Sequence, residues 1–177
     1  MDIGVISVRY ARALLKGSTE LSVEDAVYQE MQTLAKSYID VPDLRHTVDN
    51  PMIPRETKAE LLKAAAGGSV SDITSRLISL ILVEGREKVM QFIANSYVTL
   101  YRQQKNIIRG KLTTAVAVSD ATEQKMRKMV ESNTNGTVEF ETEVNPDIIG
   151  GFILEYDTYR MDASVKSQLN NILKKLA

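Results

Sequence analysis

The spacing of apolar residues changes near residue 106, and this change does most to limit the folds open to the chain. Up to about residue 105, apolar side chains recur every three or four residues, as on one face of an α-helix. From Ile107 onward they fall on every second residue, as on one face of a β-strand. The pattern predicts an α+β chain, with an all-helical domain over residues 1–105 and a small α/β domain over residues 106–177.

Six helices joined by short turns are expected in the first domain, which makes it a compact six-helix bundle. The first helix is predicted over Val5–Lys16, where Gly17 would end it. The second is predicted over Val23–Ile39, with Ser22 as its N-cap. Prolines, a serine and paired glycines mark the other four, which are expected from Pro42 to Asn50, from Pro54 to Ala66, after Ser71, and from Val89 to Gln104.

Short strands and two helices are expected in the second domain, which would form a short mixed sheet. A strand is predicted over Ile107–Val118, and a helix capped by Asp120 follows it. Residues 138–144 alternate apolar or Thr side chains with glutamates, which predicts a half-buried strand after a turn at Asn135-Gly136.

The end of the chain is predicted to form a hairpin and a final helix. Residues 152–156 and 160–161 would pair around a turn at Asp157 and Thr158. Asp162 is expected to cap the final helix. The apolar stripe of that helix consists of Val165, Leu169, Ile172, Leu173 and Leu176.

Composition excludes several kinds of site. The chain has no cysteine, so disulfides, thiolate metal sites and cysteine nucleophiles are excluded, and His46 is its only histidine. With 22 basic and 23 acidic residues the formal net charge is −1, which argues against a dedicated nucleic-acid binder. No run approaches the roughly 20 apolar residues that span a bilayer. The first residues show no signal-peptide pattern, so we expect a cytosolic start.

Three glutamates, Glu139, Glu141 and Glu143, form the most evident acidic cluster. A hydrolase or transferase that uses carboxylates would need paired acids on facing elements, whereas these three share one face of one strand. A solvated strand face is the favoured interpretation, and a docking patch for a basic partner is the alternative. His46 has no nucleophile or acid partner in any motif, so a surface imidazole is expected.

Two further features suggest binding chemistry only weakly. Basic residues near the expected link indicate an RNA- or DNA-binding adaptor, but acids elsewhere balance them and no aromatic platform interleaves with them. These basic residues are Arg102, Lys105, Arg109 and Lys111. Gly150-Gly151 opens onto a predicted strand, whereas a phosphate-binding glycine loop opens onto a helix. A structural role, through positive φ or close packing, is therefore favoured for both glycines.

Specific motifs lie at both ends and in the middle of the chain. The segment from Val138 to Glu155 combines an alternating strand, Asn-Pro-Asp, two isoleucines, two glycines and another strand. R-Y-A-R-A-L stands at Arg9–Leu14 and D-A-S-V at Asp162–Val165, and the shorter matches are Asn50-Pro51, Gly85-Arg86 and Thr114-Ala115. In these motifs, and over its whole length, the sequence resembles the delta subunit of bacterial F-type ATP synthases, akin to the mitochondrial oligomycin-sensitivity-conferring protein. One departure is Asp157, where that family commonly has glycine, so a different turn type is expected there.

The resemblance implies a non-catalytic stator subunit of a proton- or sodium-translocating F-type ATP synthase, without catalytic residues, metal or cofactor. Such a subunit links the catalytic alpha/beta head to the peripheral stalk, so that rotor torque is resisted during ATP synthesis. One copy per complex would lie at the cytoplasmic face of the bacterial cell membrane, with only indirect membrane contact. The alternative is a two-domain protein-interaction adaptor outside the ATP synthase.

The resemblance also implies where partners bind. In this family the first and fifth helices form a groove for the N-terminal helix of an alpha subunit, and the C-terminal domain holds the C-terminal ends of the b subunits. Carried over to this chain, the groove candidates are Tyr10, Ala13, Leu14, Leu77, Leu80 and Ile81. The motif residues Gly150, Gly151, Asp162 and Ser164 are expected to serve turns and caps. From the residues alone, the apolar fifth helix is either central in the bundle or binds a partner.

Overall fold

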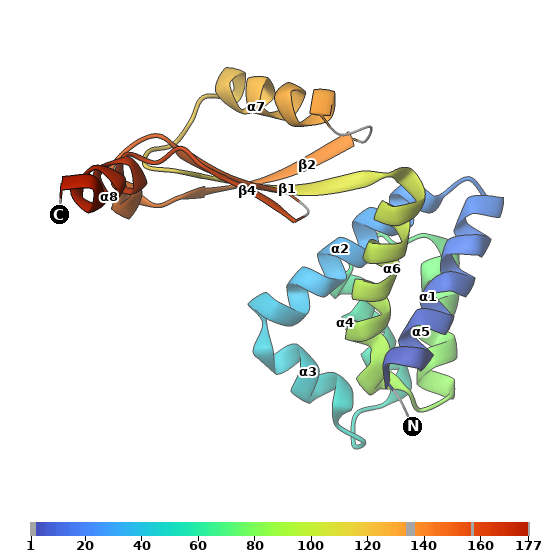
Figure 1. Cartoon of the computed structure of the whole chain (residues 1–177). Coiled ribbons are helices and arrows are strands. Elements are labelled where there is room, and N and C mark those ends of the chain that lie inside the picture. The colour runs from blue at the N-terminus through green and yellow to red at the C-terminus, as the bar shows by residue number, and fades with distance from the viewer. Residues whose placement is uncertain (1–2, 134–136, 157, 177) are drawn as a thin grey trace. The chain divides into compact units, whose positions relative to one another are not determined.

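The computed structural model describes residues 3–133, 137–156 and 158–176 (Figure 1). The chain divides into two compact units, residues 1–103 and residues 104–177. The first unit is helical and the second contains a four-stranded sheet, so the predicted combination of helices with a small mixed sheet is confirmed. Among the described residues, no helix is both long and apolar enough to cross a membrane.

Helices connected by short turns build the first unit around one core. The elements are α1 (Ile3–Glu20), α2 (Glu24–Asp40), α3 (Pro42–Asp49), α4 (Arg55–Ala65), α5 (Asp72–Val83), the 3-10 helix η1 (Glu87–Val89) and α6 (Met90–Lys105). Most of them contribute to the largest fully buried side chains, which in this unit are Val27, Met31, Leu34, Val48, Leu62, Ile78, Ile81, Met90, Ile93 and Tyr97. Burial of these apolar side chains is the main source of stability for the unit.

A cluster of tyrosines joins α6 to α1 and α2. The Tyr97 hydroxyl lies 2.9 Å from the Ser18 hydroxyl on α1. The Tyr101 hydroxyl donates to the Asp25 carboxylate on α2 at 2.6 Å, and its ring stacks on Tyr28 with centroids 4.1 Å apart. Burial raises the pKa of Tyr97 to about 12, so the phenol stays neutral and able to donate.

One predicted helix end and one predicted N-cap in the first unit are wrong. α1 continues through Gly17 to Glu20, because glycine here serves packing and does not end the helix. A Cβ on Gly17 would lie 3.0 Å from the Cδ1 atom of Ile73, so its absence lets α1 approach α5 closely. Ser22 does not cap α2: its φ is 55°, and Val23 occupies the N-cap position without a side-chain hydrogen bond.

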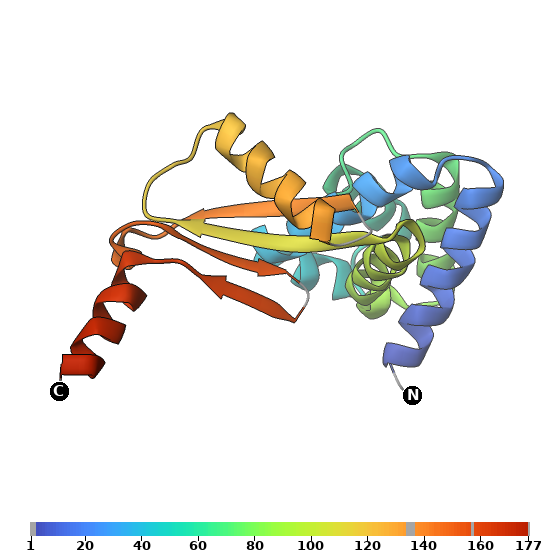
Figure 2. The same ribbon diagram turned by 45° about the horizontal axis from the view of Figure 1, so that its top comes forward.

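A mixed sheet and two helices form the second unit. The elements are β1 (Ile107–Thr114), α7 (Asp120–Asn133), β2 (Thr137–Val144), the 3-10 helix η2 (Pro146–Ile148), β3 (Phe152–Tyr156), β4 (Tyr159–Asp162) and α8 (Val165–Leu176). In the strand order β2-β1-β3-β4, β1 pairs parallel with β2 and antiparallel with β3, which pairs antiparallel with β4. α7 covers one face of the sheet and α8 lies beyond its end (Figures 1 and 2). The buried centre between α7 and the sheet consists of Val130 from α7 and of Leu112, Val138 and Leu154 from the strands.

The first strand is shorter than predicted, since it ends at Thr114 and not at Val118. The Thr114 carbonyl accepts a hydrogen bond from the Asn145 N–H at 2.7 Å, and its hydroxyl donates to the Val116 carbonyl at 2.8 Å. The first bond continues the ladder between β1 and β2, and the second belongs to the bend at residues 115–116, where the chain leaves the sheet although the alternation of apolar residues continues.

Two predicted caps in the second unit are displaced. Asp120 is already part of α7, and the carbonyl of the preceding Ser119 accepts hydrogen bonds from the first turn. Asp162 ends β4, and Ser164 caps α8, because its hydroxyl accepts from the Ser167 N–H at 3.2 Å. The turns expected at Asn135-Gly136 and at Asp157 lie outside the described residues.

Candidate partner-binding surfaces

Three of the six residues carried over to the predicted groove belong to the core. Leu14 of α1 is 4% exposed, and Leu77 and Ile81 of α5 are 7% and 0% exposed. α1 packs against α5, so these side chains stabilise the bundle and offer a partner almost no surface.

The other three candidates are accessible. Leu80 of α5 is 48% exposed, Ala13 of α1 is exposed, and Tyr10 is half-buried. The Tyr10 hydroxyl accepts a hydrogen bond from the Arg86 guanidinium at 2.8 Å. The binding role of these residues stays a prediction, but their exposure makes them the part of the groove that a partner can reach.

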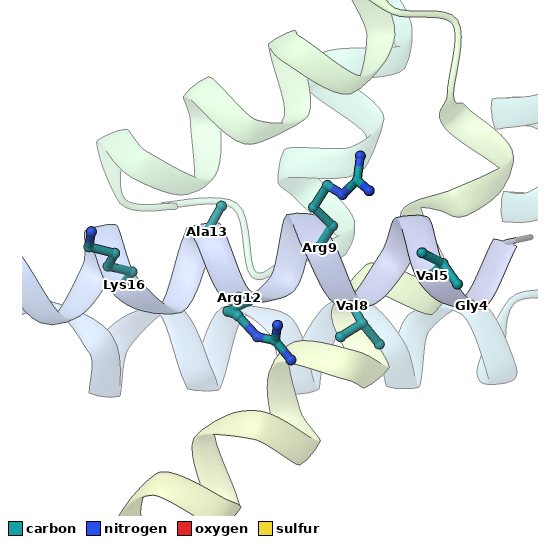
Figure 3. Close-up of a pocket in the computed structure, with 7 residues that line it drawn as sticks. All are labelled: Gly4, Val5, Val8, Arg9, Arg12, Ala13 and Lys16. Atoms are coloured by element: carbon teal, nitrogen blue, oxygen red, sulfur yellow. The ribbon is translucent and has the colours of Figure 1, made fainter.

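The outward face of α1 carries a hollow of about 750 Å³ (Figure 3). It is lined by Gly4, Val5, Val8, Arg9, Arg12, Ala13 and Lys16. Arg9 and Ala13 point to one side of the helix, and Val8 and Arg12 point to the other (Figure 3). Apolar and basic side chains therefore share this face, and none of the residues that line the hollow is acidic.

A second hollow of about 480 Å³ lies between α1 and α6. Its residues are uncharged, and they are Gly4, Ser7, Val8, Phe92, Asn95, Ser96, Thr99, Leu100 and Gln103. Phe92 is 42% exposed. Neither this hollow nor the first includes a residue of α5. Neither hollow is predicted from the sequence, although Val5, Val8 and Arg12 of the first hollow follow helical spacing on a second face of α1.

α8 presents an apolar stripe to solvent in the second unit. Val165 is 36% exposed, Leu169 47%, Ile172 54% and Leu173 64%. These are four of the five residues that the sequence predicts for the stripe. Exposed large apolar side chains in a contiguous row mark a surface for another protein more often than scattered ones do.

The paired glycines serve close packing before β3. Gly151 has φ +76°, and a Cβ there would lie 2.2 Å from the Ala163 carbonyl oxygen. A Cβ on Gly150 would lie 3.1 Å from Cγ2 of Val165, the first residue of α8. Both close approaches are to atoms of this chain, and the structural role of the two glycines stays a prediction.

Asp162 and Ser164 organise the start of α8. The Asp162 carboxylate accepts from the Ser164 hydroxyl at 2.6 Å, from the Ser164 N–H at 3.0 Å and from the Ser167 hydroxyl at 2.7 Å. The side-chain hydrogen bond from Ser164, followed by the one from its backbone, lowers the pKa of Asp162 to about 2. All three bonds are local, so these residues fix the turn between β4 and α8.

A third hollow, of about 290 Å³, lies beside the paired glycines. It is lined by Leu112, Thr114, Ala115, Val116, Val118, Thr122, Met126, Ile149, Gly150, Gly151 and Phe152.

Ile149, one of these residues, has an unusual backbone conformation. It is 62% exposed and adopts φ 70° and ψ −40°, a conformation that β-branched residues rarely take.

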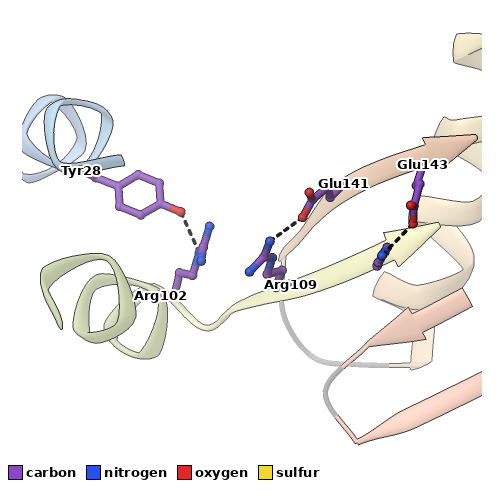
Figure 4. Close-up of polar contacts among 6 residues, drawn as sticks. Tyr28, Arg102, Arg109, Glu141 and Glu143 are labelled. Atoms are coloured by element: carbon purple, nitrogen blue, oxygen red, sulfur yellow. Dashed lines mark hydrogen bonds and ion pairs between the residues drawn. The ribbon is translucent and has the colours of Figure 1, made fainter. Parts of the chain in front are cut away.

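Acids on β2 pair with bases on β1, which accounts for two members of each charged cluster. Arg109 donates to Glu141 (Figure 4). Lys111 lies 2.7 Å from Glu143. The hydrogen bond from Arg109 lowers the pKa of Glu141, and the hydrogen bond to Glu143 raises the pKa of Lys111. These exposed pairs neutralise each other, so neither sign dominates this face of the sheet.

The remaining charged candidates have similarly ordinary surroundings. Arg102 of α6 donates to the Tyr28 hydroxyl on α2 at 2.9 Å (Figure 4). His46 is exposed on α3. Within the described part of the chain, no group of three or more His, Asp or Glu side chains is placed to hold a metal ion. The geometry therefore favours protein-binding surfaces over the carboxylate-enzyme and nucleic-acid interpretations.

The family model described as ATP synthase delta (OSCP) subunit matches residues 6–176. The ATP synthase subunit delta of Phocaeicola vulgatus is 49% identical over 173 residues, which cover 97% of this chain and 94% of that protein. The ATP synthase subunit delta of Parabacteroides distasonis is 42% identical over 172 residues, covering 97% of this chain and 96% of that protein.

The fold is similar to that of a chain in the cryo-EM structure of the Toxoplasma gondii mitochondrial ATP synthase hexamer. The TM-score is 0.66 at 20% sequence identity, and the match covers 96% of each chain. The relatives give no support to the alternative of an adaptor outside the ATP synthase. The chain belongs to the ATP synthase delta (OSCP) family of non-catalytic peripheral-stalk subunits of the F-type ATP synthase.

Proposed function

We propose that the helical bundle of residues 1–105, a six-helix bundle, binds the N-terminal helix of an alpha subunit of the catalytic head. The outward face of α1, together with Leu80 of α5, is the proposed site. The observation that carries this proposal is the hollow on α1, whose lining residues place Val5 and Val8 among three cations and include no acid. An amphipathic helix that carries acidic residues beside its apolar face complements such a surface.

The test is calorimetric titration of the full chain with a synthetic peptide that reproduces the N-terminal helix of the same organism's alpha subunit. We expect a one-to-one complex of micromolar or tighter affinity, which Leu80→Asp abolishes. Leu80 is 48% exposed, so this variant is expected to fold. A folded sample that gives no heat of binding contradicts the proposal.

Ile39→Asp is the matched control for Leu80→Asp. Ile39 is 71% exposed and lies near the C-terminus of α2, as Leu80 lies near that of α5. Both variants place the same charge at the same unfavourable end of a helix, so the cost to helix stability is comparable. Equal loss of peptide affinity in the two variants would mean that Leu80 has no specific role.

The cations of α1 allow a second test at the same site. Arg9, Arg12 and Lys16 line the hollow, so affinity for an acidic helix should fall as salt concentration rises. Arg12→Glu should weaken binding at low salt and remove most of this salt dependence. If affinity does not change with salt concentration, the cations of α1 do not contribute to binding and only the apolar contacts do.

We also propose that the second unit binds the C-terminal ends of the b subunits through the stripe on α8. The exposed side chains of Leu169, Ile172 and Leu173 support this assignment. Leu173→Asp should abolish binding of a peptide that reproduces the C-terminal end of the b subunits. Asn171→Asp, which adds the same charge at an exposed position outside the stripe, should leave it unchanged.

Two separate sites on one chain would convert two docking contacts into a single tether. Once one unit is bound, the other is held at a high effective concentration near its own partner. One copy per complex, at the cytoplasmic face of a bacterial membrane, would then hold the head against rotor torque while protons or sodium ions pass. Membrane association would be indirect, through the b subunits.

A further inference from the structure

Arg86 holds the phenol of Tyr10, and this contact joins the end of α5 to the middle of α1. The Arg86 Nη1 atom donates to the Tyr10 hydroxyl at 2.8 Å. The guanidinium carbon lies 5.7 Å from the centroid of the Tyr10 ring. Both side chains are half-buried, so the contact is only partly screened by water.

The backbone of Arg86 is fixed on both sides of the residue. Gly85 adopts φ +64° directly after α5 and reverses the chain there. The Arg86 N–H donates to the Ile81 carbonyl at 2.9 Å, and the Arg86 carbonyl accepts from the Val89 N–H at 3.0 Å. The guanidinium therefore extends toward α1 from a rigid point.

Tyr10 occupies the boundary between the buried and the outward faces of α1. Leu14, one helical turn further on, is 4% exposed, whereas Ala13 lines the hollow on the outward face. The hydrogen bond from Arg86 ties the Tyr10 hydroxyl to the segment that follows α5.

We propose that Arg86 is a positioning residue for the alpha-binding surface: it holds Tyr10 as a fixed wall where α1 meets the end of α5. This inference rests on the proposed function. With the wall in place, the outward face of α1 and the side chain of Leu80 stay open to the partner helix. Without it, the Tyr10 ring loses its fixed position beside that face.

The chain contains a second pair of the same kind, which provides an internal control. Arg102 donates to the Tyr28 hydroxyl at 2.9 Å, and its guanidinium carbon lies 5.8 Å from the Tyr28 ring centroid. This pair joins α6 to α2, and neither residue lines the hollow on α1. Replacing either arginine removes a comparable contact, but only Arg86 acts on Tyr10.

The experiment is titration of the full chain with the peptide that reproduces the N-terminal helix of the alpha subunit, in parallel with thermal unfolding. Arg86→Lys keeps the charge but loses the planar donor pair, and it should weaken affinity roughly tenfold. Arg102→Lys should lower the melting temperature to a similar extent and leave affinity within about twofold of the unmodified chain. Tyr10→Phe keeps the ring without its hydroxyl and should reproduce most of the effect of Arg86→Lys.

A double-mutant cycle completes the test. If Arg86 acts through Tyr10, the Arg86→Lys and Tyr10→Phe effects on affinity will be far from additive. Additive effects, or equal loss of affinity in Arg86→Lys and Arg102→Lys, overturn the inference. Unchanged affinity in Arg86→Lys, with Leu80→Asp still abolishing binding, overturns it while the proposed function stands. An unmodified chain that does not bind the peptide overturns both.

Discussion

Gly151 packs directly against the backbone of Ala163, so closely that a Cβ on Gly151 would lie 2.2 Å from the Ala163 carbonyl oxygen. The contact joins the start of β3 to the segment between β4 and α8, where the Ala163 N–H also donates to the Phe152 carbonyl at 3.0 Å. It sets the position from which α8 begins. Glycine is required here twice over, by φ +76° and by the lack of space.

The first prediction is that Gly151→Ala destabilises the second unit by on the order of 3 kcal/mol or more. The methyl group both strains the backbone and collides with an atom that cannot turn aside. Loss of amide hydrogen-exchange protection in β3 and β4 would measure the effect. Exchange rates equal to those of the unmodified chain would contradict the prediction.

Two other glycines separate the two causes. Gly68 has φ +85° with nothing within 4 Å of a Cβ, so Gly68→Ala reports backbone strain alone. A Cβ on Gly150 would meet only the Val165 side chain, at 3.1 Å, so Gly150→Ala reports a contact that a small shift can relieve. Each should cost about 1 kcal/mol, clearly less than Gly151→Ala.

Elements with strong local signals are predicted well from the sequence. The alternating segment predicted over residues 138–144 is found as Thr137–Val144, and the helix predicted from Pro54 to Ala66 is found as Arg55–Ala65. The spacing of apolar residues, prolines and paired glycines each influence only a few neighbouring residues. Their effect can therefore be predicted from the sequence of one chain.

Features that depend on distant contacts are predicted poorly. Glycine is a residue type that often ends a helix, so the sequence predicts an end at Gly17. In the structure Gly17 lies inside α1, where the lack of a Cβ makes room for the side chain of Ile73 on α5. The pairing of Glu141 with Arg109 arises because β1 and β2 lie parallel in register, which neither segment shows by itself. Long-range packing decided the outcome in both cases.

The candidate site illustrates the same limit. Helical spacing places Leu77, Leu80 and Ile81 on one helix, but it does not tell which side other helices cover. The structure buries Leu77 and Ile81 and exposes Leu80, because α1 and α4 pack against α5. A resemblance to a family indicates which positions correspond, but it does not tell whether each side chain is exposed in this chain. Three of the six residues predicted for the groove are therefore found in the core.

The second prediction concerns pH. The folded-state pKa of Asp162 is about 2, below its ordinary value of 3.8, so the unfolded chain binds more protons between these pH values. The stability that Asp162 contributes is therefore fully present above about pH 4 and is lost as pH falls toward 2. Asp162→Asn should lower the melting temperature at neutral pH, and the two proteins should converge near pH 2.

Ser167→Ala should show an intermediate loss of the stability that Asp162 contributes. It removes one of the donors to Asp162 and leaves the two from Ser164, so its melting temperature at neutral pH should lie between those of the other two proteins. Melting curves of Asp162→Asn and the unmodified chain that stay equally far apart from pH 7 to pH 2 would show that the carboxylate charge is not responsible.

The third prediction is that Ile149→Gly stabilises the chain. Ile149 holds φ 70° and ψ −40° although its side chain is 62% exposed, so little burial compensates for the strained backbone. Glycine relieves the strain and costs more entropy on folding, for a net gain of about 1 kcal/mol. Urea unfolding would measure it. Ile149→Val keeps the β-branch and should give no gain; equal gains in both variants would point to a cause other than backbone conformation.

The last prediction is an asymmetry at a buried ion pair. The Lys58 ammonium on α4 lies 3.1 Å from the Glu87 carboxylate, with side chains 4% and 17% exposed. Glu87→Ala leaves a buried cation without its counter-charge and should cost about 3 kcal/mol. Lys58→Met keeps the apolar stem and leaves Glu87 able to reach water, so it should cost clearly less. Unfolding free energies in urea would compare them, and a larger cost for Lys58→Met would mean that Lys58 stabilises the unit through contacts other than the charge.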